Sequence, residues 1–240
     1  MADTPTDITT LSVIIPAYNE LRTIAAVIAR VNAVEVHGLH KEIIVVDDGS
    51  TDGTRDVLAA LQRDGRARVI LQPANRGKGA AVRTGLEAVT GDLVIIQDAD
   101  LELSPEEYPR LVAPFLADPT TAAVFGSRFL SGSREGRPLA ILANRFLTGL
   151  TNVLHNASLT DMETCYKLCR TDVLKALDLK SERFDIEPEI TSKLLRRGYA
   201  IREVAISYQP RSRREGKSIN WKDGVRAIMA LIKWRFARKP

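Results

Sequence analysis

Four short runs of β-branched and other apolar residues recur along the first hundred positions of the chain. The runs are Leu11–Ile15, Ile43–Val46, Val69–Leu71 and Leu93–Ile96. The segments between them carry apolar residues at helical spacing, most clearly between Leu21 and Val34. Short, continuously apolar strands that alternate with helices are typical of a parallel sheet covered on both faces. The pattern therefore predicts an α/β domain with a mostly parallel central sheet and helices on both sides of it.

The length and composition of the chain fit one such domain. A chain of 240 residues with 45% hydrophobic content can bury a core of its own. No uninterrupted apolar run approaches the ~20 residues that span a bilayer, and the polar start is unlike a secretory signal. We therefore expect a single domain over residues 1–240, in the cytoplasm or on a membrane surface.

Polar residues follow three of the predicted strands at the point where each strand ends. These groups are Tyr18–Glu20, Asp47-Asp48 and Asp98–Asp100. The carboxyl ends of parallel strands meet at one edge of a sheet, and α/β proteins bind their ligands beyond that edge. We therefore expect the three groups to line one site.

Asp98 and Asp100 stand two residues apart in the turn after the fourth strand, and Glu102 follows two residues later. Mg²⁺ and Mn²⁺ prefer oxygen ligands and share their coordination shell with phosphate oxygens. Acidic turns are common, but two carboxylates beside a buried strand repel each other unless a cation lies between them. The placement therefore predicts a divalent metal site formed by these three side chains.

Asp47 and Asp48 have two possible roles. Such a carboxylate accepts a ring N–H of a nucleotide base, or it caps the next helix by bonding its free N–H groups, and one aspartate can serve each role. The basic loop Asn75–Gly79 precedes a helix and suits either a phosphate or a plain turn. Its spacing is not that of a P-loop. No G-x-G-x-x-G follows the first strand, which counts against a nicotinamide-dependent oxidoreductase.

The C-terminal tail concentrates the positive charge of the chain. Residues 209–240 hold ten Lys and Arg and two acidic residues, although the net charge of the whole chain is only +4. Apolar residues at helical spacing between Trp221 and Phe236 predict an amphipathic helix. The helix either lies on an anionic membrane or packs its apolar face on the domain. No nucleic-acid-binding motif accompanies the charge, so we expect no nucleic-acid partner.

Five motifs occur in an order and at spacings that resemble those of the family-2 glycosyltransferases. They are SVIIPAYNE (Ser12–Glu20), VVDDGSTDGT (Val45–Thr54), NRGKGAAVRTG (Asn75–Gly85), DADLE (Asp98–Glu102) and GSR (Gly126–Arg128). Three further motifs resemble the branch that glycosylates polyprenyl or dolichyl phosphate: TDMETCYKL (Thr160–Leu168), FDIEPEIT (Phe184–Thr191) and REGKSINWKDG (Arg214–Gly224). The resemblance implies the A-type glycosyltransferase fold. Its Rossmann-like nucleotide-sugar half would cover about residues 11–103, its acceptor half 104–218 and a basic helix 219–240.

The resemblance also implies roles for single residues. The nucleotide-contacting positions are Pro16, Tyr18, Glu20 and Asp48; the metal and diphosphate motif is Asp98, Asp100 and Glu102; the arginine associated with the acceptor phosphate is Arg128. A second acceptor-side arginine, expected shortly after Pro138, is replaced by apolar residues, and Arg145 is the nearest candidate to take its place.

The implied reaction moves a hexose, glucose or mannose, from a UDP- or GDP-sugar to a polyprenyl phosphate, with inversion and with Mg²⁺ or Mn²⁺. Lys78, Arg213 and Lys217 would add fixed positive charge around the diphosphate. A phosphate acceptor needs no general base, whereas a hydroxyl acceptor would need a carboxylate such as Asp161 or Glu163. Such a hydroxyl acceptor, or nucleotide-sugar binding without turnover, remains the alternative. A lipid acceptor implies a peripheral position at the inner face of the membrane.

Overall fold

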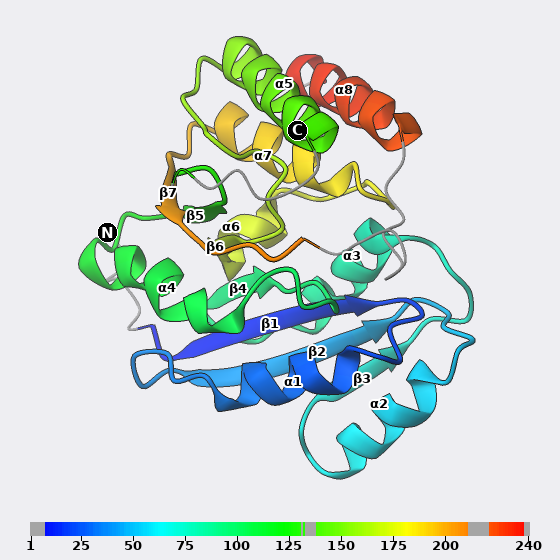
Figure 1. Ribbon diagram of the computed structural model, residues 1–240. Coiled ribbons are helices and arrows are strands. Elements are labelled where there is room, and N and C mark those ends of the chain that lie inside the picture. Colours follow the sequence, from blue (N-terminus) through cyan, green and yellow to red (C-terminus); the bar gives the residue numbers. More distant parts are fainter. Residues whose placement is uncertain (1–7, 131, 133–137, 211–220, 238–240) are drawn as a thin grey trace.

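The computed structural model of the protein describes residues 8–130, 132, 138–210 and 221–237, with side chains from residue 224 onward in the last segment (Figure 1). The strands are β1 (Thr10–Ala17), β2 (His40–Asp47), β3 (Arg68–Leu71), β4 (Leu93–Ile96), β5 (Ala123–Ser127), β6 (Lys167–Arg170) and β7 (Ile201–Ala205). The helices are α1 (Ile24–Ala33), α2 (Thr54–Arg63), α3 (Lys78–Ala88), the short 3₁₀ helix η1 (Pro105–Glu107), α4 (Tyr108–Ala117), α5 (Pro138–His155), α6 (Thr171–Ala176), α7 (Ile186–Arg196) and α8 (Trp221–Phe236).

The described strands form one sheet in the order β3-β2-β1-β4-β6-β5-β7. Only β6 runs against its neighbours, because β4 and β5 both pair with it in the antiparallel sense and every other pairing is parallel. The mostly parallel sheet predicted from the apolar runs is therefore confirmed. Sequence reasoning missed β6, because this strand is only four residues long and begins and ends with a basic residue.

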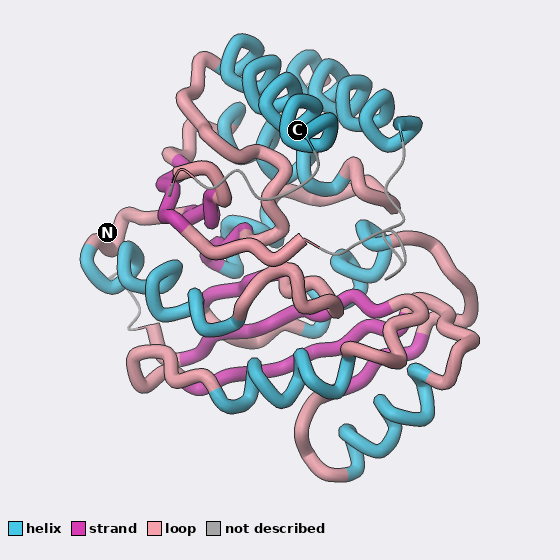
Figure 2. Tube along the Cα trace, viewed as in Figure 1, coloured by secondary structure: helices cyan, strands magenta, loops and turns pink. Residues whose placement is uncertain are grey.

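Helices cover both faces of the sheet, as predicted. Figure 1 shows α1 and α4 in front of the strands and α3 behind them, and Figure 2 shows loops joining strand to helix along the sheet edge. Helix α3 lies close against β1 and β2. A Cβ added to Gly85 would stand 2.6 Å from Cγ2 of Ile14 and 3.3 Å from Cγ2 of Val46. Glycine at this position therefore lets the helix approach the sheet.

A second layer of helices lies beyond β5, β6 and β7. Helices α5, α7 and α8 lie together at the top of Figure 1. A small hydrophobic cluster joins α5 to α8 through Leu147, Ala227 and Leu231, apart from the main core. Helix α5 begins at Pro138. Proline suits a first helical turn because it has no N–H to leave unbonded. No described helix is long and apolar enough to cross a bilayer.

The close approach of α3 to the sheet generates a stability prediction. Gly85→Ala adds a methyl group where Ile14 leaves too little room, and overpacking of a core costs about 1–3 kcal/mol. Better helix propensity offsets about 1 kcal/mol of that cost. We expect a net loss of up to about 2 kcal/mol in the free energy of unfolding, measured by chemical denaturation. Gly149→Ala on α5 is the matched control, because no heavy atom lies within 4 Å of the added Cβ. This control variant should be unchanged or slightly stabilised.

Candidate active site

The loops that follow β1 and β2 are tied together at the carboxyl edge of the sheet. The Asn19 N–H donates to Ser50 Oγ at 2.9 Å, and the Glu20 N–H donates to Thr54 Oγ1 at 3.0 Å. The Tyr18 side chain between them is 46% exposed. Pro16 is paired with Val46 in the register of β1 and β2. The predicted nucleotide loops therefore lie side by side, and the roles of Pro16, Tyr18 and Glu20 stay predictions.

The acidic turn follows directly from β4. Backbone pairing with β1 continues as far as Gln97, whose N–H donates to the Ile14 carbonyl at 2.9 Å. Asp98 is 30% exposed at its side chain, and Asp100 is only 8% exposed as a residue. Asp100 Oδ1 accepts the Glu102 N–H at 2.9 Å, which fixes the bend of the turn. Both aspartates therefore belong to an ordered turn at the ligand-binding edge.

Gln97 directly follows β4 and fixes this turn by hydrogen bonds. Sequence reasoning missed this role. Its Oε1 accepts the hydroxyls of Tyr108 and Tyr166, each at 2.7 Å, and its Nε2 donates to the carbonyl of Asp98 at 3.0 Å. The two tyrosine rings meet edge to face at 5.8 Å. Burial raises the pKa of both hydroxyls, which keeps them as donors. A polar residue at the end of an apolar strand was the only signal in the sequence.

Lys78 forms ion pairs with two carboxylates of the site. Its Nζ lies 2.7 Å from Asp98 Oδ1 and 3.0 Å from Glu187 Oε1, and its side chain is 12% exposed. The same Glu187 reaches the fully buried Lys167 through Oε2 at 2.7 Å. Burial alone would lower the pKa of Lys78, but Asp98, Cys165 and Glu187 raise it well above its usual value. Lys78 is therefore a permanent positive charge that joins β4 to α7.

The ligands predicted for a metal lie in this turn, but they do not form a closed protein cage. Among the described residues, no three His, Cys, Asp or Glu side chains gather as a metal would require. Glu102 accepts the Tyr208 hydroxyl at 3.0 Å through Oε2. Asp98 shares its carboxylate with Lys78. The donor chemistry fits a hard divalent cation only where substrate oxygens complete the shell, so the metal site stays a prediction.

Asp48 and Asp47, for which a base contact and a helix cap were predicted, bind different groups in the structure. The Asp48 carboxylate accepts the N–H of Arg76 at 2.8 Å and that of Gly77 at 2.7 Å, one on each oxygen. Asp47 accepts the N–H groups of Gly49 and Ser50 and the Arg55 side chain. The expectation that the amides of the 75–79 loop face a phosphate is wrong for those of Arg76 and Gly77, because Asp48 already binds them. A base contact by Asp48 stays a prediction, since a carboxylate accepts more than two hydrogen bonds.

Gly77 explains why this loop is glycine-containing. Its φ of +104° is a backbone conformation that residues with a side chain rarely adopt. An added Cβ would also lie 2.5 Å from the carbonyl oxygen of Glu182. That carbonyl accepts the Ala80 N–H, so the start of α3 is bound to the segment before α7. The close approach places Lys78 between Asp98 and Glu187.

Arg128, the predicted acceptor-side arginine, is held by Asp161. Its Nε lies 2.7 Å from Oδ2 of Asp161 and its Nη2 lies 2.8 Å from Oδ1. Asn144 also donates to the Asp161 carboxylate, at 3.0 Å. Burial would lower the pKa of Arg128, but its hydrogen bonds to Asp161 raise it. Asp161 therefore holds an arginine in place in this structure.

The structure brings Arg128 and Arg145 to one aromatic ring. The guanidinium carbons lie 5.9 Å and 5.7 Å from the centroid of Phe129. Arg128 also lies 5.2 Å from the ring centroid of Tyr208, whose hydroxyl bonds Glu102. The arginine predicted as a replacement therefore sits beside the one it would assist. Arg213 and Lys217 lie outside the described residues, and their roles stay predictions.

Glu163 is a half-buried residue whose carboxyl oxygen Oε1 is buried close to these charges. Its Oε1 has no hydrogen-bond partner in the structure. Burial raises its pKa to about 7, with smaller opposing effects from Lys167, which lowers it, and Glu187, which raises it. A carboxyl that titrates near neutral pH is suited to proton transfer. Of the two carboxylates considered as a general base, Glu163 therefore fits that role better than Asp161.

The raised pKa of Glu163 predicts a pH-dependent stability. The folded protein keeps this proton up to about pH 7, whereas the unfolded chain releases it near the ordinary value of 4.5. Ionised Glu163 therefore lowers stability as pH rises through this window. We expect Glu163→Gln to raise the free energy of unfolding by roughly 1–3 kcal/mol at pH 8 and to have no such effect at pH 4. Glu87→Gln, on the exposed side of α3, should show no pH-dependent difference in the same denaturation series.

Known proteins resemble this chain along most of its length. The sequence profile described as glycosyl transferase family 2 matches residues 12–178. An undecaprenyl-phosphate 4-deoxy-4-formamido-L-arabinose transferase of Edwardsiella ictaluri is 33% identical over 213 residues, which cover 86% of this chain and 62% of that protein. A dolichol-phosphate mannosyltransferase of Pyrococcus furiosus is 30% identical over 234 residues, or 93% of this chain and 64% of that protein. The chain thus spans less than two thirds of the length of these relatives.

Solved structures share the fold. A glucosyl-3-phosphoglycerate synthase from Mycobacterium tuberculosis in complex with UDP aligns with a TM-score of 0.74 at 24% identity, over 96% of this chain and 82% of that one. The same enzyme with Mn²⁺, UDP and phosphoglyceric acid aligns with a TM-score of 0.72. The predicted fold and family resemblance are thereby confirmed. Since the profile covers more than half of the chain, from β1 to α6, the chain belongs to glycosyl transferase family 2.

Proposed function

We propose that the protein is an inverting glycosyltransferase that moves a hexose from a UDP- or GDP-sugar to a polyprenyl phosphate. Tyr208 carries this proposal, because it joins the donor and acceptor sides of the site. Its hydroxyl donates to Glu102 in the acidic turn, and its ring lies against Arg128. A diphosphate at the turn and a phosphate at the arginine pair would thus be neighbours. The relatives named above are transferases named for undecaprenyl phosphate and dolichol phosphate.

The acceptor chemistry suits an arginine pair. A phosphate monoester is already an anion at neutral pH, so its attack on the anomeric carbon needs no proton removed. It needs orientation and partial screening of its charge, which guanidinium groups provide by paired hydrogen bonds. Arg128 is held in place by Asp161, and Arg145 is exposed beside it. Attack of this phosphate on the face of the sugar opposite the leaving diphosphate would give inversion.

The donor side of the site carries positive charge that stabilises the leaving diphosphate. Lys78 is a fixed cation beside Asp98, and it stabilises negative charge that develops on a departing diphosphate. Asp98 and Asp100 would hold a Mg²⁺ or Mn²⁺ ion, with Glu102 nearby. The ion would supply further charge neutralisation of the diphosphate. Structures of similar fold contain Mn²⁺ or Mg²⁺ together with UDP, which supports this assignment.

A hydroxyl acceptor is the second candidate function, and Glu163 is the observation that favours it. A general base is required to remove a hydroxyl proton, and a carboxyl with a pKa of about 7 meets that need. Transfer to a free sugar, lost in Glu163→Gln while binding of the donor persists, would establish this candidate in place of the first.

A lipid acceptor places the protein at a membrane surface. We propose a peripheral position at the inner face of the membrane, with the C-terminal helix in contact with it. Helix α8 packs one side on the protein through Ala227, Ala230 and Leu231. It also leaves Met229 and Phe236 exposed. The buried side of α8 therefore supports packing on the domain, and its exposed side supports contact with a membrane.

The metal proposal is tested at Asp100. We expect Asp100→Asn to lower kcat/KM by about 100-fold or more, because the carboxylate is needed for the ion and the ion for the leaving group. The assay follows nucleotide release from a panel of UDP- and GDP-sugars with polyprenyl phosphate and Mg²⁺ or Mn²⁺. Asp56→Asn, in the exposed first turn of α2, should keep full activity. Undiminished turnover in EDTA would remove the metal from the mechanism.

The acceptor proposal is tested at Arg145. Arg145→Ala should raise the KM for polyprenyl phosphate by roughly tenfold, because one phosphate contact is lost, and leave the KM for the donor sugar unchanged. The residue is exposed, so the variant should fold normally. Arg66→Ala, an exposed arginine just before β3, controls for loss of charge. An equal rise in both KM values would contradict an acceptor role.

A further inference from the structure

Helix α5 presents an apolar stripe to solvent. Leu139, Leu142, Phe146 and Val153 are spaced three, four and seven residues apart, which places them on one face of the helix. All four are exposed. The buried Leu147 lies on another face, in the cluster that joins α5 to α8. The stripe therefore points away from the protein.

Helix α8 presents a second stripe of the same kind. Val225, Met229, Ile232 and Phe236 repeat at helical spacing, and the eight residues of the two stripes are 43 to 82% exposed. Helices α5 and α8 lie side by side at the top of the molecule in Figure 1. The two helices thus form an outer layer with apolar side chains on its solvent face. Exposed apolar stripes of this kind mark an interaction site.

Basic residues border the stripe on α8. Arg226 directly follows Val225, and Lys233 directly follows Ile232, so each lies about 100° further round the helix. Arg235 precedes Phe236 and lies about 100° to the other side. Apolar side chains with cations on both flanks are the pattern of a helix lying in an anionic lipid interface.

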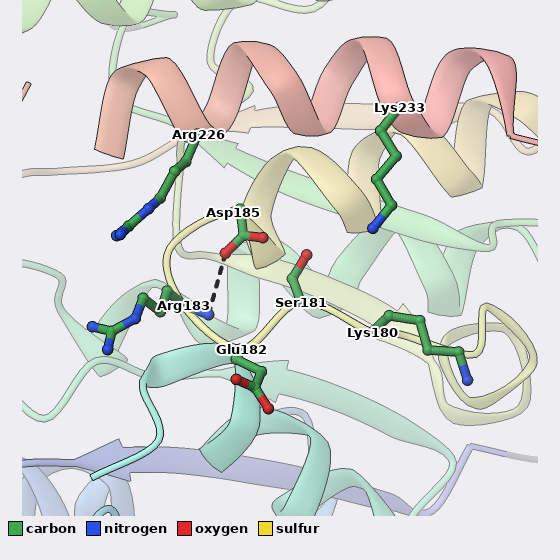
Figure 3. Close-up of a pocket in the computed structure, with 7 residues that line it drawn as sticks. All are labelled: Lys180, Ser181, Glu182, Arg183, Asp185, Arg226 and Lys233. Carbon is green, nitrogen blue, oxygen red and sulfur yellow. Dashed lines mark hydrogen bonds between the residues drawn. The ribbon is translucent and has the colours of Figure 1, made fainter. Parts of the chain in front are cut away.

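The cations on one flank also line a cavity. It measures about 380 Å³ and lies between α8 and the segment before α7, with Lys180, Ser181, Glu182, Arg183, Asp185, Arg226 and Lys233 in its wall. Figure 3 shows Arg226 and Lys233 reaching from α8 toward that segment. Four of these side chains are basic and two are acidic.

The two acidic residues of the wall are partly engaged elsewhere. Glu182 pairs with Arg76 at 3.3 Å, and Asp185 Oδ1 accepts the backbone N–H of Arg183 at 3.2 Å. Arg183 has an exposed side chain, and Lys233 contacts the ring of Trp234. Lys180 pairs with Asp178 at 2.6 Å, so Arg183 and Lys233 are the wall residues whose positive charge suits a phosphate group.

We propose that this cavity binds the phosphate headgroup of an anionic phospholipid, and that the stripes of α5 and α8 enter the membrane surface beside it. The inference rests on the proposed function, which requires a lipid acceptor. Charge complementarity selects the occupant: a second copy of this chain would bring the same basic flanks and repel them, whereas an anionic membrane attracts both flanks and takes up the apolar stripes.

Vesicle co-sedimentation of the full chain tests the proposal. We expect binding to phosphatidylglycerol-containing vesicles, weakened by added salt, and little binding to phosphatidylcholine vesicles. The double variant Arg183→Ala with Lys233→Ala should bind the anionic vesicles about tenfold more weakly or worse. The double variant Phe146→Ser with Met229→Ser should lose binding to a similar extent.

Matched controls separate the surface from general charge and hydrophobicity. Arg63→Ala with Arg66→Ala removes two exposed cations near α2, and Leu116→Ser removes an exposed leucine on α4. Neither should change vesicle binding. Binding that is indifferent to lipid charge, or equally reduced by these controls, would overturn the proposal.

Two further measurements identify other occupants. A dimer seen by analytical ultracentrifugation that Phe146→Ser abolishes, without any vesicle binding, would assign the face to a second copy. Loss of inorganic phosphate binding in Arg183→Ala with Lys233→Ala, with vesicle binding intact, would make the cavity a site for free phosphate. Either result contradicts the proposal.

Activity assays separate this inference from the proposed function. Met229→Ser with Ile232→Ser, both exposed on α8, should keep turnover with a short, water-soluble polyprenyl phosphate and lose it with an acceptor embedded in vesicles. Absence of turnover with both acceptors in the unaltered protein would refute the proposed function, whatever the vesicle binding shows.

Discussion

The buried ammonium of Lys78 is the interaction on which the arrangement of the site depends. A charge in this position is tolerated only with partners, and Lys78 has one on each side: Asp98 after β4 and Glu187 at the start of α7. Glu187 in turn satisfies Lys167, the buried first residue of β6. Removal of Glu187 would leave the fully buried Lys167 without its carboxylate partner. The network thus fastens the acidic turn after β4 to α7 and to β6.

This fastening gives the donor and acceptor sides a fixed relation. Gln97 donates a hydrogen bond to the carbonyl of Asp98 in the acidic turn, and Tyr208 donates one to Glu102. Asp161 binds Arg128, whose guanidinium lies against the ring of the same tyrosine. Each charged group near the proposed reaction is therefore positioned by a second residue. Preorganisation of this kind is what electrostatic catalysis requires, because charges that are already oriented need not rearrange as the sugar departs.

Sequence patterns predicted the sheet and the edge where the site lies, because strand ends and polar turns follow local rules. They could not predict β6, since a strand that begins with Lys167 is stable only through a partner twenty residues away. They left the 75–79 loop open between a phosphate site and a plain turn, whereas the fold gives the amides of Arg76 and Gly77 to Asp48. The role of Gln97 was missed because its hydrogen-bond partners also come from other parts of the chain. Its importance comes from two tyrosines that are distant in sequence.

Helix α5 connects the proposed reaction to the proposed membrane face. Arg145 lies against Phe129 beside Arg128, and the next residue, Phe146, belongs to the exposed stripe. Neighbouring residues on a helix point about 100° apart, so one helix presents a phosphate ligand toward the site and an apolar side chain toward the lipid. A polyprenyl phosphate held by Arg145 would have its hydrocarbon chain leave along that stripe. The apolar residues after Pro138, which displaced the expected arginine, then serve the same acceptor at its other end.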